Sequence, residues 1–170
     1  APGKFFQQHR LIDAEYRRRL NSAQTIAPLH LKAQLAELDE LAQIFPEIPI
    51  FGLSDSAFFS FLSVEAKLYG LPRGLAEQFE IYRYGYHGLS GASILQQLRG
   101  GGGELPEKLI ICHLGSGASI TALHQGQPID TAMGFTPLEG LVMGTRVGSI
   151  DAGAVLYLAK NLPGGIEAVE

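Results

Sequence analysis

Residues 109–120 constrain the possible folds more than any other part of this sequence. Four apolar residues lead into a turn of small residues, and a second strand-like run follows. Gly115 and Gly117 allow the backbone to turn tightly and to direct N–H groups outward, while Ser116 and Ser119 add hydroxyl donors. The pattern predicts a strand–turn–strand unit that can cradle a phosphate. An ordinary β-hairpin has the same signature, so this segment alone does not identify a site.

Helical and strand-like segments alternate along the chain, which is typical of an α/β fold. We expect helices over residues 11–20, 31–45, 90–98 and 151–160. Strands are expected over residues 48–53 and 79–84, twice within 108–123, and over 127–132, where Pro128 favours an edge position. The remaining segments are predicted to be a loop over 27–30, a helix or crossover over 57–71, and an ordered functional loop over 134–148.

Composition argues against two classes of function. The formal net charge is −4, and residues 17–19, the one basic run, are expected to be a solvated helix face, so no nucleic-acid partner is expected. No apolar run approaches the ~20 residues that cross a bilayer, and no signal-peptide pattern is present. We therefore expect no membrane partner and a cytoplasmic location. The single cysteine, Cys112, is expected to be a small core residue.

Four polar groups stand where an expected strand gives way to a turn: Asp55, His87, the 113–117 loop and Arg146. Together they suit phosphoryl transfer, in which a protein mainly positions the reactants and stabilises charge on the equatorial oxygens. Arginine is a permanent bidentate donor, histidine donates to an oxygen, and a carboxylate orients a metal or the attacking group. Simpler readings stay open: a helix cap for Asp55, a turn residue for His87 and a surface cation for Arg146.

At these residues the sequence resembles the acetate kinase (acetokinase) family. The matching segments are residues 27–30, 55–58, 83–88, 111–117 and 130–146, in the family's order. The resemblance implies the actin/sugar-kinase/Hsp70-like (ribonuclease H-like) fold, in which two domains enclose a nucleotide cleft. Family members are longer, so we expect an incomplete, central piece. Residues 1–58 would end the first, acyl-substrate-side domain, and residues 59–170 would begin the second, nucleotide-binding domain.

The resemblance also implies a role for each matching position. The catalytic residues would be Asp55, His87 and Arg146, the aspartate arranging Mg²⁺ and the acyl substrate and the other two steadying the phosphoryl group. The loop for the phosphates of ATP would comprise His113, Leu114, Gly115, Ser116 and Gly117. The residues at the acyl substrate would be Leu29, His30, Tyr86 and Pro137. The metal ligands are expected mainly outside residues 1–170.

The implied reaction is reversible, in-line phosphoryl transfer between ATP and acetate, giving ADP and acetyl phosphate. A propionate kinase of the same family and a non-catalytic nucleotide-binding homologue are the alternatives. The intact protein is expected to be a homodimer, and this portion alone is expected to be inactive. Two departures bear on the site: the family usually has Asn at the position of Ser116 and Phe at that of Tyr86.

Overall fold

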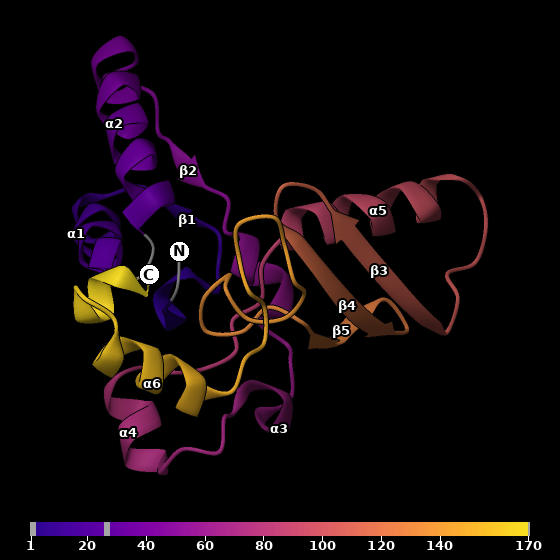
Figure 1. Ribbon diagram of the computed structural model, residues 1–170. Coiled ribbons are helices and arrows are strands. Elements are labelled where there is room, and N and C mark those ends of the chain that lie inside the picture. The colour runs from indigo at the N-terminus through magenta and orange to yellow at the C-terminus, as the bar shows by residue number, and fades with distance from the viewer. Residues whose placement is uncertain (1–2, 26–27, 170) are drawn as a thin grey trace.

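The computed structural model describes residues 3–25 and 28–169, which form helices around two small antiparallel sheets (Figure 1). Strands β1 (Arg10–Leu11) and β2 (Phe51–Gly52) make a two-stranded pair. Strands β3 (Lys108–Leu114), β4 (Ala118–His124) and β5 (Gln127–Thr131) form the second sheet in that order. In Figure 1 the pair lies with α1 and α2 at the left, and the larger sheet lies with α5 at the right.

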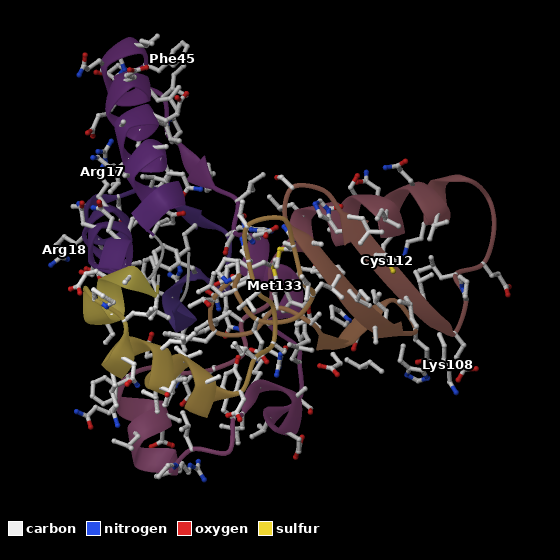
Figure 2. The ribbon with its side chains drawn as sticks, in the orientation of Figure 1. Arg17, Arg18, Phe45, Lys108, Cys112 and Met133 are labelled. Atoms are coloured by element: carbon white, nitrogen blue, oxygen red, sulfur yellow. The ribbon has the colours of Figure 1, made fainter. Side chains whose placement is uncertain are left out.

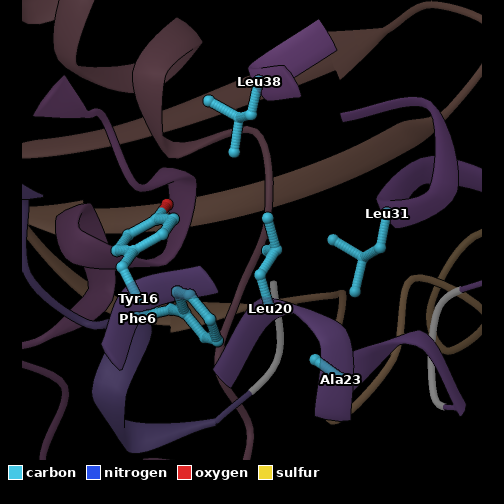
Figure 3. Packing of buried hydrophobic residues seen from close by; sticks show 6 residues of the cluster. All are labelled: Phe6, Tyr16, Leu20, Ala23, Leu31 and Leu38. Atoms are coloured by element: carbon cyan, nitrogen blue, oxygen red, sulfur yellow. The ribbon is translucent and has the colours of Figure 1, made fainter. Parts of the chain in front are cut away.

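The N-terminal part is built on helices α1 (Ala14–Ser22) and α2 (Pro28–Ile44). The carboxylate of Asp13 caps α1 by accepting a 2.7 Å hydrogen bond from the backbone N–H of Tyr16. One apolar cluster joins the two helices to the N-terminal turn, and Figure 3 shows its members: Phe6, Tyr16, Leu20, Ala23, Leu31 and Leu38. This core fixes the approach of β1 and β2 to the centre of the molecule.

One expectation for this part is wrong. Residues 28–30 belong to α2 instead of a loop, because a proline suits the first turn of a helix, where its missing N–H has no partner to lose. The basic run is largely solvated, as expected: Arg18 and Arg19 are exposed. Figure 2 shows Arg17 beside them on α1, where this half-buried residue pairs with Asp39 of α2 and donates to the carbonyl of Leu38 at 2.9 Å. Its neighbour Arg18 pairs within α1.

Helix α5 (Gly88–Gly100) covers one face of the β3–β4–β5 sheet. Leu95 of α5 is buried against Ile111 of β3 and Leu123 of β4. Successive residues of a strand face opposite sides of its sheet, so the neighbours of Ile111 point away from α5. Cys112 is accordingly exposed, not part of the core as expected (Figure 2).

Three short helices connect the two sheets: η3 (Asp55–Phe59), α3 (Val64–Lys67) and α4 (Arg73–Gln78). The strand expected over residues 79–84 is absent. The backbone N–H of Arg83 bonds to the carbonyl of Lys67 at 2.8 Å, and that of Tyr84 bonds to Gly134 at 3.1 Å. One amide thus bonds to the end of α3 and the other to the loop after β5, so no ladder forms.

The Gly-rich loop between β5 and helix α6 (Ala152–Asn161) is ordered by a cluster of side chains, as expected. The carboxylate of Glu139 accepts from Arg83 at 3.0 Å and from the Tyr69 hydroxyl. The same hydroxyl accepts the backbone N–H of Phe135 at 2.8 Å. These bonds hold the loop, drawn in orange in Figure 1, across the middle of the molecule. The chain then ends in the short helix η4 (Gly165–Ala168). In the described residues no helix has the length and hydropathy of a membrane span.

Candidate functional site

The turn between β3 and β4 consists of Gly115, Ser116 and Gly117. The N–H of Gly115 is used within the turn, donating to the carbonyl of Gly117 at 3.0 Å. Within the described part of the chain, the N–H groups of Ser116 and Gly117 have no acceptor and remain available to a ligand. The turn therefore has two backbone amides that could bind an anion, as a phosphate cradle requires.

Gly117 is required for space, not for a special backbone angle, because its φ is not positive. A Cβ at this position would lie 3.2 Å from Nε2 of His87 and 3.4 Å from Nη1 of Arg146. His87, 30 positions before Gly117, and Arg146, 29 positions after it, therefore meet beside the turn. This convergence was expected from the sequence.

Asp55 holds His87 through the backbone. Its carboxylate accepts the N–H groups of His87 and Leu89, the latter at 2.9 Å, and so caps the first turn of α5. His87 precedes α5 in the left-handed region at φ 61° and ψ 25°, an uncommon conformation for a residue with a side chain. The helix-cap reading of Asp55 thus applies, but to α5 and not to the helix that Asp55 itself begins.

The imidazole rings of His87 and His113 stack, with ring centroids 4.0 Å apart and planes 14° from parallel. Nδ1 of His87 lies 2.9 Å from Oγ of Ser119, and Nδ1 of His113 lies 3.0 Å from Oγ of Ser90. The Nε2 atoms of both rings lie beside the turn glycines. Two ring nitrogens are therefore presented to whatever the turn binds.

Burial lowers the pKa of His87 below its usual value, and the neighbouring His113 and Arg146 lower it further, against an opposing effect of Asp55. Removing charged groups from water disfavours their ionised form. The surroundings of His87 therefore favour the neutral form of its imidazole. A neutral imidazole can donate from one nitrogen and accept at the other.

Arg146 lies in a tight turn in which the N–H of Met143 donates to the Arg146 carbonyl at 2.9 Å. Its Nη1 donates to the carbonyl of Pro137 at 3.1 Å, which aims the guanidinium at Gly117. Among the described side chains, no carboxylate pairs with Arg146. Its remaining N–H groups are free for an anion.

The residues expected at the acyl substrate are only partly described. The Tyr86 hydroxyl donates to the carbonyl of Phe135 at 2.9 Å, and burial holds the pKa of Tyr86 well above its ordinary value. Tyr86 thus lies against the loop that carries Pro137. The side chains of Leu29 and His30 lie outside the described residues. Leu114 is 74% exposed on the sheet face opposite α5, so only its backbone is near the turn.

The sequence assigns the hydroxyl of Ser119 to the turn, whereas in the structure this hydroxyl bonds to His87. The alternation of side chains along a strand could have predicted this contact. Ser119 stands opposite His113 in the β3–β4 register, so both side chains lie on the face that α5 covers.

The chain is similar to known proteins in sequence and in structure. The Acetokinase family model matches residues 1–170. The acetate kinase of Protochlamydia amoebophila is 44% identical over 161 residues, which are 94% of this chain and 40% of that protein. The propionate kinase of Edwardsiella piscicida is 38% identical over 170 residues, 99% of this chain and 42% of that protein. The crystal structure of the acetate kinase from Entamoeba histolytica has a TM-score of 0.87 and 29% identity, over 99% of this chain and 43% of that one. The chain thus spans about 40% of the length of the curated relatives it matches.

Proposed function

The chain belongs to the acetokinase family, and we propose that the intact protein transfers a phosphoryl group reversibly between ATP and acetate. The products would be ADP and acetyl phosphate, so the protein would be a phosphotransferase with a carboxyl group as acceptor. Its fold is the expected actin/sugar-kinase-like α/β type, present here as a portion of the whole.

One observation carries the proposal: His87, His113 and Arg146 converge at Gly117, where two backbone amides are free. This is a built anion site, with a permanent cation, two imidazole nitrogens and turn amides around one small volume. During in-line transfer, charge spreads over the equatorial oxygens of the migrating group. Arg146 would bind those oxygens, His87 would donate to one of them, and the 113–117 turn would hold the phosphates of ATP.

Asp55 would have two roles, one in positioning His87 and one at the reacting groups. Its two backbone bonds hold His87 at the start of α5. Each carboxylate oxygen keeps a further lone pair, which can face the acyl substrate or a metal-bound group. The catalytic assignment of Asp55 therefore remains part of the proposal.

Mg²⁺ would accompany ATP. Among the described residues no group of three or more His, Cys, Asp or Glu gathers. Following the family resemblance, we propose that the metal ligands lie mainly outside residues 1–170, and we assign no step of the transfer to a metal on this chain.

For the acyl group, the proposed pocket is lined by Leu29, Tyr86 and Pro137, with His30 nearby. The Tyr86 hydroxyl already bonds to the Phe135 carbonyl. The presence of Tyr86 where the family usually has Phe therefore adds no unpaired polar group beside the methyl of acetate. Propionate is the alternative substrate, since one methylene is worth only ~1–3 kcal/mol of discrimination in such a pocket.

The remaining assignments concern the whole protein. We propose that residues 1–58 end the acyl-substrate-side domain and that residues 59–170 begin the nucleotide-binding domain. The intact protein would be a cytoplasmic homodimer whose partners are ATP and a short-chain carboxylate, with no nucleic acid or membrane partner. Residues 1–170 alone would have no useful activity.

The test is the activity of the intact protein carrying Arg146→Ala. Acyl phosphate is trapped with hydroxylamine, and ATP affinity is measured separately. We expect kcat to fall by ~10²–10³-fold, the cost of removing one preorganised donor to transition-state charge, with near-normal ATP binding. Arg73→Ala is the matched control, because Arg73 is an exposed arginine on α4 whose one partner in the described part of the chain is Glu77.

Two outcomes would overturn the proposal. An intact protein that binds ATP but forms no acyl phosphate from formate, acetate, propionate or butyrate is a binding protein, not a kinase. An Arg146→Ala variant as active as Arg73→Ala removes Arg146 from the site. A preference for propionate across the same panel would replace acetate by propionate within the same chemistry.

A further inference from the structure

We propose that Ser119 is a positioning residue that fixes His87 in the tautomer with its proton on Nε2. The N–H of that nitrogen then points at the anion site beside Gly117. The tautomer follows from hydrogen bonding alone, whereas its use in phosphoryl transfer rests on the proposed function.

Ser119 has one hydrogen-bond partner within residues 3–25 and 28–169. It lies on β4 under α5, is 2% exposed, and places Oγ 2.9 Å from Nδ1 of His87. No other described group forms a hydrogen bond with this hydroxyl. Water has little access to it. The direction of this one bond therefore decides where both protons lie.

A hydroxyl has one hydrogen to donate and two lone pairs that can accept. If Nδ1 of His87 donated to Oγ, the hydroxyl proton of Ser119 would be buried without an acceptor, which carries the full desolvation penalty of a lost hydrogen bond. If Oγ donates to Nδ1, only lone pairs are left unfilled, which proteins tolerate more readily. Ser119 is therefore the donor, and the proton of the neutral ring is on Nε2.

The groups around the ring favour this neutral form. His113 of β3 stacks on one face, Arg146 of the Gly-rich loop approaches from the side of Nε2, and Asp55 of η3 bonds to the backbone of His87. Two of these three neighbours disfavour an imidazolium, as does burial. The ring can then act as a donor without carrying charge.

The second imidazole provides an internal contrast. His113 bonds to Ser90, which is only half-buried on the first turn of α5. Water can satisfy the Ser90 hydroxyl in either direction, so no tautomer of His113 is enforced. The inference is therefore specific to the pair formed by Ser119 and His87.

The experiment is ¹⁵N NMR of histidine side chains in the intact protein near pH 7.5, without ATP or acetate. We expect Nδ1 of His87 to resonate as an acceptor nitrogen and Nε2 as a protonated one. Ser119→Ala should give a mixture of tautomers and weaken the binding of inorganic phosphate by about tenfold. Ser119→Thr restores the hydroxyl and should recover both properties.

Thr131→Val is the matched control, because Thr131 is also a buried hydroxyl on the same sheet but has no partner in the described residues. It should change neither property. A proton on Nδ1 of His87 in the unmodified protein would overturn the inference, whatever the fate of the variants. So would a Ser119→Ala variant with unchanged tautomer or unchanged phosphate affinity. Failure of the kinase assay alone would leave the tautomer intact, so the two proposals fail separately.

Discussion

Replacing Gly117 by alanine tests the geometry of the site with one methyl group. The new Cβ would lie 3.2 Å from Nε2 and 3.3 Å from Cε1 of His87, and 3.4 Å from Nη1 of Arg146. The contacts with His87 are a few tenths of an ångström too short, so the end of its side chain must move, while the contact with Arg146 is at van der Waals distance. A misplacement of ~1 Å at such a site costs ~10² in rate, and this shift is smaller. We expect kcat/KM of the intact protein to fall by roughly 10- to 100-fold.

Stability should change far less than activity. The φ of Gly117 is not positive, so alanine adds no backbone strain there. Restricting the unfolded chain favours the variant by ~0.4–1 kcal/mol, and crowding against two side-chain ends opposes this by a similar amount. The net change in the free energy of unfolding should be within ~1 kcal/mol, measured by urea denaturation alongside the hydroxamate assay.

Gly74→Ala provides the control, because nothing lies within 4 Å of a Cβ at that position of α4. It should leave kcat/KM unchanged and stabilise the protein by up to ~1 kcal/mol through helix propensity. A Gly117→Ala variant with normal kcat/KM would refute the convergence of His87 and Arg146 at the turn. The same conclusion would hold if activity fell only in proportion to the fraction of the variant that is unfolded.

Three further outcomes follow from the same contacts. Gly88→Ala should destabilise the protein by ~3 kcal/mol in urea titrations, because a Cβ there overlaps the backbone carbonyl of Asp55, and backbone atoms do not move easily. An unchanged denaturation midpoint would show that α5 does not approach η3 so closely. Thr131→Val should be neutral or stabilising by up to ~1 kcal/mol, since it removes a buried hydroxyl without a partner; a marked loss of stability would reveal a bond to that hydroxyl. The pKa of His87 is lowered on folding, so the unfolded chain binds more protons between that lowered value and the unfolded value near 6.5. The free energy of unfolding should therefore rise with pH through this window and level off above it. His87→Gln should reduce this slope, and an unchanged slope would contradict a lowered pKa.

The sequence predicted much of the second half because its signals are local. Two apolar runs around a glycine turn specify β3 and β4, and Gly126 marks the next reversal, after which Pro128 lies on the edge strand β5. The convergence of His87, the 113–117 turn and Arg146 was also expected, and the structure brings them together.

The incorrect predictions concern features that depend on tertiary contacts. The segment 79–84 resembles a strand, but the amides of Arg83 and Tyr84 bond to the end of α3 and to the loop after β5. Cys112 and Ile111 belong to the same apolar run, and the side on which α5 packs decides which of them is buried. Asp55 caps a helix that begins more than thirty residues later, a pairing that no capping pattern in the sequence contains.

The most direct test of the central claim is the coupling energy between His87 and Arg146, from a double-mutant cycle of His87→Ala and Arg146→Ala on kcat/KM of the intact protein. If both side chains bind the same phosphoryl group, their effects are strongly non-additive, with a coupling energy of at least ~1 kcal/mol. Additive losses, with a coupling energy near zero, would show that the two residues do not share a site.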